Sequence, residues 1–228
     1  MILDLGLIDY EECYCIQKDM VMQRKLCKID DTLILAEHNS IFTIGRTGSR
    51  ANILVDDNYL GSRGIKVLSV DRGGDITFHG EGQLVLYPII ALNGKYRDLH
   101  LYMRNLEDVA IKLLKRYSLT ADRCPGHTGV WVSGMKVASI GVGASNWVTY
   151  HGLSINIKTD LDFFDMIYPC GIKDAGMTSL RRLIGKDIAM DEVKREAAAD
   201  FKSVFNAVSE SFASAGALGM SACFNSLC

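Results

Sequence analysis

The segment from Arg72 to Pro88 constrains this chain more than any other. It reads Arg-Gly-Gly-Asp-Ile-Thr-Phe-His-Gly-Glu-Gly-Gln and continues with Leu-Val-Leu-Tyr-Pro. Two pairs of glycines enclose a short β-prone run, and glycine lets another chain or a ligand approach the backbone closely. A structural hairpin that contains a chance histidine is one interpretation. The other is a binding loop, in which polar side chains aim at one point: Arg72, Thr77, His79 and Gln83.

Composition and charge exclude several classes of protein. The chain has 228 residues, 48% of them hydrophobic and 23% charged, which is ordinary for a globular protein of one large or two small domains. Its formal net charge of -2 gives no reason to expect nucleic acid or an anionic membrane as a partner. No apolar run is long enough to span a bilayer, and residues 1–12 do not resemble a signal or transit peptide. We expect a cytoplasmic protein.

The cysteines point to neither a disulfide framework nor a metal site. There are 7 of them, at irregular spacing and without a Cys-x-x-Cys pair. We therefore expect mostly reduced thiols and no metal. No Gly-x-x-x-x-Gly-Lys-[Ser/Thr] motif exists, and Gly141-Val142-Gly143 lacks the third glycine of a dinucleotide fingerprint.

Periodicity and capping residues predict an α+β fold with mixed β-sheets flanked by helices. Helices are expected at about 10–28, 100–117 and 190–212, with Asp9, Asp98 and Asp191 as N-caps. Pro88 suggests that the strand carrying it is an edge strand or ends there. The expected strands are 2–7, 32–36, 41–46, 66–70, 76–78, 83–90, 128–132, 135–142 and 148–157, with a hairpin turn at Ser133-Gly134.

Cys170 is distinguished from the other cysteines by its surroundings. It lies between Pro169 and Gly171 in a stretch that we expect to be a loop, where reactive groups are common. A thiol attacks as the thiolate and needs a neighbouring cation or base at neutral pH. The candidates are Lys136, which lies among small and apolar residues, and the histidines of two similar triplets, Phe78-His79-Gly80 and Tyr150-His151-Gly152. Two such triplets suggest two loops that meet at a shared cleft. Each has a structural interpretation as well: a lysine with its head in water, or a hydrogen-bonded histidine.

Together these motifs resemble the lipoyl(octanoyl) transferases, also called the lipoate-protein ligase B family. The resemblance runs from about Leu33 to Leu183. It is carried by Glu37-His38 with Thr43-Ile-Gly-Arg, the Arg72 segment, Lys136-Val-Ala-Ser-Ile-Gly, Trp147-Val-Thr-Tyr-His-Gly, and Pro169-Cys-Gly with Thr178-Ser-Leu. Each motif alone is weak, but five in this order are specific.

The resemblance implies the fold of the biotin and lipoate protein ligase catalytic domains, and a reaction. An octanoyl or lipoyl group would move from acyl carrier protein to a lysine of lipoyl domains, those of 2-oxoacid dehydrogenases or the glycine cleavage H protein, without a cofactor. Cys170 would be the acyl-thioester nucleophile, and Lys136 would lower the pKa of its thiol. His151 and Gln83 would support the site. The walls of the acyl and substrate site would be Arg72, Gly73, Gly74, Asp75, Ile76, Thr77, Phe78, His79, Ser139, Ile140, Gly141, Gly152, Leu153 and Ser154.

The chain departs from the family pattern at Glu81, at Asn39-Ser40, and at Gly143 and Asn146, where a basic residue is common. We expect a single catalytic domain over residues 1–212, and a small-residue C-terminal tail, 213–228, that frays or is disordered. Three other functions fit the same residues: an ATP-dependent lipoate or biotin ligase, a Cys-His hydrolase, and a non-catalytic binder of carrier proteins.

Overall fold

The computed structural model describes residues 1–168 and 176–216, and the side chains of these except Lys95 and residues 206–216. A seven-stranded sheet forms the centre of the molecule, in the order β1-β2-β6-β10-β9-β8-β7. Strands β1 and β2 are parallel, and every other neighbouring pair is antiparallel. The strands are β1 (Ile2–Ile8), β2 (Thr32–His38), β6 (Gln83–Ile89), β7 (Asp122–Cys124), β8 (His127–Val132), β9 (Met135–Ser145) and β10 (Val148–Asn156).

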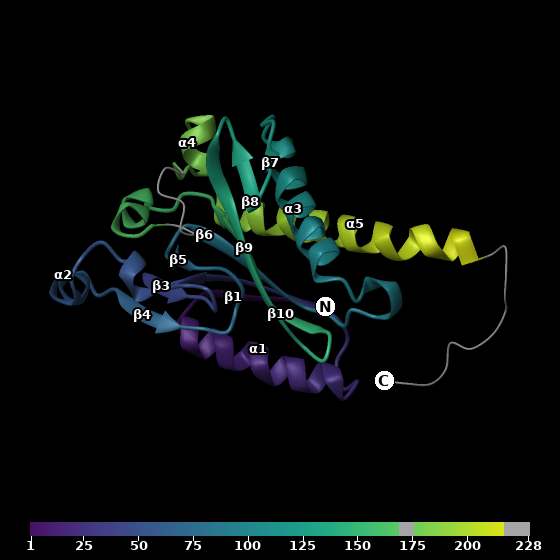
Figure 1. Cartoon of the computed structure of the whole chain (residues 1–228). Coiled ribbons are helices and arrows are strands. Elements are labelled where there is room, and N and C mark those ends of the chain that lie inside the picture. Colours follow the sequence, from purple (N-terminus) through teal and green to yellow (C-terminus); the bar gives the residue numbers. More distant parts are fainter. Residues whose placement is uncertain (169–175, 217–228) are drawn as a thin grey trace.

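A second, three-stranded sheet lies at one end of the molecule (Figure 1). It has the order β4-β3-β5, with β3 (Ile41–Ile44) parallel to β4 (Lys66–Ser69) and antiparallel to β5 (Ile76–His79). Ile76 and Phe78 belong to the small hydrophobic core beneath this sheet. The short helices α2 (Asp57–Ser62), η1 (Arg50–Asn52) and η3 (Leu161–Met166) complete this part of the molecule.

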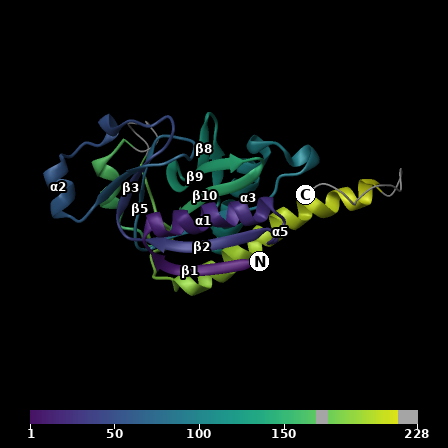
Figure 2. The same cartoon turned by 90° about the horizontal axis from the view of Figure 1, so that it is seen from below.

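Helices cover both faces of the large sheet (Figures 1 and 2). Helix α1 (Tyr10–Lys25) packs against β6 and β10 on one face, and α3 (Leu99–Arg116) packs against β8, β9 and β10 on the other. Helix α5 (Met190–Gly216) lies against α3. Helix α4 (Leu180–Ile184) and the short η2 (Gly94–Tyr96) lie in connections. In the two described ranges, no helix has the length and apolar character required to cross a membrane.

This mixed α+β architecture agrees with the prediction from sequence, and most local signals were correct. Asp9 accepts a hydrogen bond from the N–H of Glu11, and Asp98 caps α3 through the N–H groups of His100 and Leu101. Ser133 and Gly134 both have positive φ angles, of 49° and 78°, in the turn between β8 and β9. Such angles are typical of the two-residue turns that match the twist of a hairpin.

Three local predictions differ from the structure. Asp191 lies inside the first turn of α5, not at its N-cap, because the helix begins one residue earlier. Pro88 lies near the end of β6, opposite Leu33, and β6 is an interior strand of the sheet. Of the two predictions for Pro88, the strand end was therefore correct and the edge strand was wrong. Glu37 and His38 belong to β2 and not to the turn that follows it.

Candidate active site

A narrow pocket lies where the small sheet meets the large one. Its walls come from β5, from the Arg72 loop, from β6, β9 and β10, and from the first residue of α1. Its volume is about 40 Å³, little more than the share of liquid volume of one water molecule. The lining residues are Tyr10, Arg72, Gly74, Asp75, Thr77, His79, Val85, Tyr87, Ser139, Ile140, Gly141, His151, Gly152, Leu153 and Ser154.

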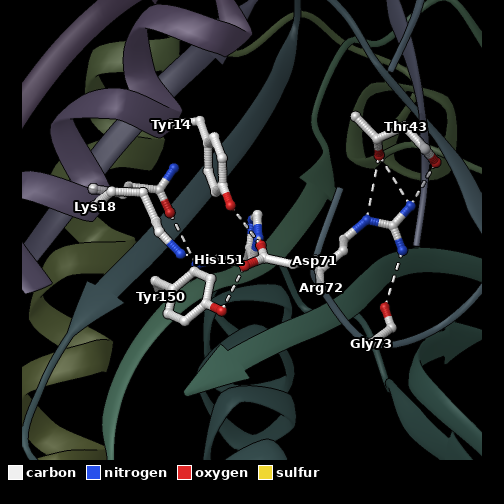
Figure 3. Close-up of polar contacts among 9 residues, drawn as sticks. Tyr14, Lys18, Thr43, Asp71, Arg72, Gly73, Tyr150 and His151 are labelled. Carbon is white, nitrogen blue, oxygen red and sulfur yellow. Dashed lines mark hydrogen bonds and ion pairs between the residues drawn. The ribbon is translucent and has the colours of Figure 1, made fainter. Parts of the chain in front are cut away.

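The Arg72 loop is tied to both sheets by hydrogen bonds. The guanidinium of Arg72 is buried and donates to the hydroxyl and carbonyl oxygens of Thr43 on β3, at 2.6 to 3.3 Å. It also donates to the carbonyl of Gly73, as Figure 3 shows. The N–H of Gly73 donates to the carbonyl of Val142 on β9 at 2.8 Å. These bonds hold the loop as a fixed wall of the pocket.

His79 begins a buried chain of hydrogen bonds that ends at Lys136. Its Nδ1 lies 2.7 Å from Oε1 of Gln83, and because that amide oxygen only accepts, Nδ1 carries the proton. Gln83 donates to Oδ1 of Asn156, and Asn156 donates to the carbonyl of Thr178. The N–H of Thr178 donates to the carbonyl of Lys136 at 2.9 Å. Gln83 thus connects the pocket to the backbone of Lys136. Burial lowers the pKa of His79 well below its usual value.

Asp71, immediately before Arg72, is the centre of a polar cluster that joins α1 to β10 (Figure 3). Its Oδ1 accepts from the hydroxyl of Tyr14 at 2.7 Å and lies 2.8 Å from Nε2 of His151. Its Oδ2 accepts from the hydroxyl of Tyr150 at 2.8 Å and from Nζ of Lys18 at 3.2 Å. Burial raises the pKa of Asp71, but these four hydrogen bonds outweigh it and hold the pKa below its usual value. Asp71 is therefore a carboxylate.

His151 is held in one tautomer by this carboxylate. Because Asp71 can only accept, Nε2 of His151 donates, and Nδ1 is left as a buried acceptor without a partner among the described residues. The ring of His151 stacks on that of Tyr14, and its backbone N–H donates to Gln17. Burial lowers the pKa of His151 to about 4, although the hydrogen bond with Asp71 raises it. The imidazole is neutral at physiological pH.

Gly143, one of the departures from the family pattern, makes room for this cluster. It lies opposite Tyr150 in the pairing of β9 with β10. A Cβ atom at position 143 would lie 2.6 Å from Cζ of the Tyr150 ring. The glycine therefore lets the ring lie against β9 with its hydroxyl at Asp71.

Lys136 lies on β9, outside the pocket lining, with its side chain almost fully buried at 2% exposure. Its Nζ is 5.0 Å from the centre of the Trp131 ring, a cation–π distance. The backbone of Lys136 is hydrogen-bonded to Gly176 and to Thr178. The predicted nucleophile, Cys170, lies outside the described residues.

The structure brings together most of the other predicted site residues. Of the predicted wall residues, three do not line the pocket: Gly73, Ile76 and Phe78. Ile76 and Phe78, on β5, belong to the small hydrophobic core, and the N–H of Gly73 is hydrogen-bonded to β9. His79 and His151 line one pocket as expected, but both lie on strands and not on loops. Tyr10, Val85 and Tyr87 also line the pocket, and no sequence motif indicated them. Within residues 1–168 and 176–216, no group of three or more His, Cys, Asp or Glu side chains could hold a metal ion.

Solved structures of two ligase types share this fold. A bi-partite lipoate protein ligase from Thermoplasma acidophilum aligns with a TM-score of 0.69 at 15% identity, covering 90% of this chain and 83% of that one. The biotin protein ligase from Aquifex aeolicus aligns with a TM-score of 0.51 at 14% identity, covering 92% and 70%. The fold is therefore that of the lipoate and biotin protein ligase catalytic domains.

Sequence comparison defines the family more narrowly. The family model of the lipoyl protein ligase A/B catalytic domain matches residues 9–202. An octanoyltransferase from Rubrobacter xylanophilus is 47% identical over 201 residues, which cover 87% of this chain and 90% of that protein. The chain belongs to the octanoyltransferases of the lipoyl protein ligase A/B family, as its sequence motifs predicted.

Proposed function

We propose that the chain moves an octanoyl group from acyl carrier protein to a lysine of a lipoyl domain, through a thioester on Cys170. The thiolate of Cys170 attacks the carbonyl carbon of the carrier thioester, the bond from that carbon to the carrier sulfur breaks, and the carrier thiol leaves with a proton from the ammonium of Lys136, which becomes a neutral amine. The acceptor lysine gives one proton of its ammonium to Lys136 and then attacks the new thioester as an amine. An amide forms, the thiolate of Cys170 is released, and the second proton lost by the nitrogen goes to solvent. Because a thioester is converted to an amide, the two steps together lower the free energy, and the reaction needs no ATP.

The surroundings of Lys136 carry this proposal. Lys136 is buried on β9, and a lysine ammonium beside a thiol stabilises the thiolate. Its backbone N–H donates to the carbonyl of Gly176 at 2.8 Å. Cys170 precedes Gly176 by six residues, and six residues span at most about 21 Å. On the other side, Tyr168 donates its N–H to the carbonyl of Asn52 at 2.9 Å. Both neighbours of the segment that carries Cys170 are therefore anchored, one of them at the lysine.

The pocket beside β9 is the proposed site for the acyl chain. Its lining includes apolar groups from Val85, Ile140 and Leu153, together with the Arg72 loop. At about 40 Å³ the pocket is too small for eight carbons, so binding of the acyl chain requires side chains of the lining to move. Lys136 is the proposed base for the ammonium of the acceptor lysine, in a general-base role.

Intact-mass analysis after mixing with octanoyl-carrier protein tests the proposal. One octanoyl group should be added, and hydroxylamine should remove it. Cys170→Ala should abolish the addition, whereas Cys15→Ala, which removes an exposed free thiol, should leave it unchanged. Lys136→Ala should slow the addition at neutral pH and recover at high pH, where the thiol ionises without help.

Other outcomes would assign one of the alternative functions. Release of free octanoate without an acceptor would indicate a hydrolase. A requirement for ATP, with Cys170→Ala still active, would indicate a ligase. Stable binding of the carrier protein without acylation would indicate a binder.

A further inference from the structure

The side chain of Lys136 lies in a slot formed by strand β8. Lys136 is paired with Trp131 across β8 and β9, so both side chains are on the same face of the sheet. The register shifts between Val130 and Trp131, because Val130 pairs with Ala138 and Trp131 with Lys136. The shift leaves Val137 as the extra residue of β9, and Nζ of Lys136 lies 5.0 Å from the centre of the Trp131 ring.

Gly129 forms the floor of this slot. It precedes Trp131 by two residues and therefore lies on the same face of β8. A Cβ atom at position 129 would lie 2.6 Å from Cε and 3.3 Å from Nζ of Lys136, and 2.6 Å from the carbonyl oxygen of Ala138. The φ angle of Gly129 is 138°, which residues other than glycine rarely adopt. The end of the Lys136 side chain thus lies directly against the backbone of Gly129.

A buried carboxylate holds Gly129 in this position. The N–H of Gly129 donates to Oε1 of Glu107 at 3.1 Å, and Glu107 on α3 is 1% exposed. The other oxygen of Glu107 accepts from Arg104 and from Arg123, each at 2.7 Å. The floor of the slot is therefore fixed to α3, and it is not a mobile strand end.

We propose that Gly129 is a positioning residue of the transfer reaction: the absence of a side chain there leaves the space in which the ammonium of Lys136 is held. Trp131 closes the slot on one side, and the segment Gly176–Thr178 holds the backbone of Lys136 on the other. The proposal rests on the proposed function for its chemical consequence. The slot itself is a property of the described residues.

Labelling of Lys136 with acetic anhydride, followed peptide by peptide with mass spectrometry, tests the slot without any acyl transfer. In the unmodified protein Lys136 should react slowly compared with the exposed Lys202. Gly129→Ala should increase the labelling of Lys136 several-fold. Gly134→Ala is the matched control, because Gly134 also has a positive φ angle, 78°, but no atom lies within 4 Å of a Cβ there. It should leave the labelling unchanged.

A double-mutant cycle keeps the test decisive if Gly129→Ala is severely destabilised. Shortening the lysine removes the contact, so Gly129→Ala should cost less stability in a Lys136→Ala background than in the natural one. Gly134→Ala should cost the same in both. Equal costs for Gly129→Ala in the two backgrounds would overturn the proposal, as would unchanged labelling of Lys136 in a folded Gly129→Ala variant.

The reaction provides the last measurement. Gly129→Ala should shift the pH midpoint of Cys170 acylation upward by about one unit, which is a tenfold loss of rate below the midpoint. Adding Gly129→Ala to Lys136→Ala should change nothing more. An additive loss would show that Gly129 acts other than through the lysine. If the natural protein is not acylated at all, the proposed function fails, and the labelling and the cycle still decide whether the slot exists.

Discussion

Replacing Asp71 with asparagine should destabilise the protein by about 3 kcal/mol. The carboxylate accepts from Tyr14, Tyr150, His151 and Lys18. A hydrogen bond to a charged group contributes about 1.5–3 kcal/mol. The side chain of Asp71 is 35% exposed, so each bond from the two tyrosines and the histidine is discounted to roughly 1 kcal/mol. The Lys18 pair is largely in solvent and adds little. An asparagine keeps one acceptor oxygen and turns an amide donor toward groups that donate.

Urea unfolding at pH 7 measures this loss, because the slope and midpoint give the free energy of unfolding. Asp57→Asn is the control: this carboxylate is 77% exposed and pairs only with Arg50 among the described residues. It should change stability by less than about 0.5 kcal/mol. The pKa of Asp71 lies below its usual value, so its contribution is present above about pH 4 and is lost as the pH falls further. A loss under about 1 kcal/mol for Asp71→Asn would refute the assignment of Asp71 as the centre that joins α1, β10 and the Arg72 loop.

Two further results are expected. Stability should fall as the pH drops from about 6.5 toward 4, because burial lowers the pKa values of His38 and His151 to about 4 and the unfolded chain binds protons first. By pH 5 each histidine should remove about 2 kcal/mol, and a stability that stays flat in urea titrations from pH 7 to pH 5 would contradict the burial of neutral rings. Gly143→Ala should cost about 1–3 kcal/mol, because the new Cβ displaces the ring of Tyr150 from Asp71. Gly61→Ala, in α2 with open space around the new Cβ, should be neutral or stabilising, and an equal effect of the two substitutions in thermal unfolding would rule out the ring contact.

Local signals in the sequence predicted the parts of the fold that depend on near neighbours. Asp9 and Asp98 cap helices through N–H groups two or three residues away, and Ser133-Gly134 turns a hairpin within its own two residues. Such features follow from short-range chemistry. The prediction that Asp191 is the N-cap of α5 was wrong, because an acidic residue is favourable in the first turn of a helix as well as at its N-cap.

The site was only partly predictable, because its contacts join distant segments. His79 and His151 were expected to share a cleft on the strength of two similar triplets, and they do line one pocket. Asp71 was overlooked. It is a single acidic residue before Arg72, and its four partners, Lys18, Tyr14, Tyr150 and His151, lie 53 to 80 residues away in sequence. A helix pattern does not show which face of α1 will meet β10, so only the packing of sheet and helix reveals the cluster.

Transfer from the isolated acyl-enzyme shows whether the thioester on Cys170 is an intermediate of the reaction. The octanoylated protein, freed of carrier protein and nucleotides, is mixed with a lipoyl domain, and both masses are followed with time. We predict that the octanoyl group leaves Cys170 and appears as an amide on one lysine of the lipoyl domain. An octanoyl group that stays on Cys170, or that leaves as free octanoate while the lipoyl domain remains unmodified, would contradict the account.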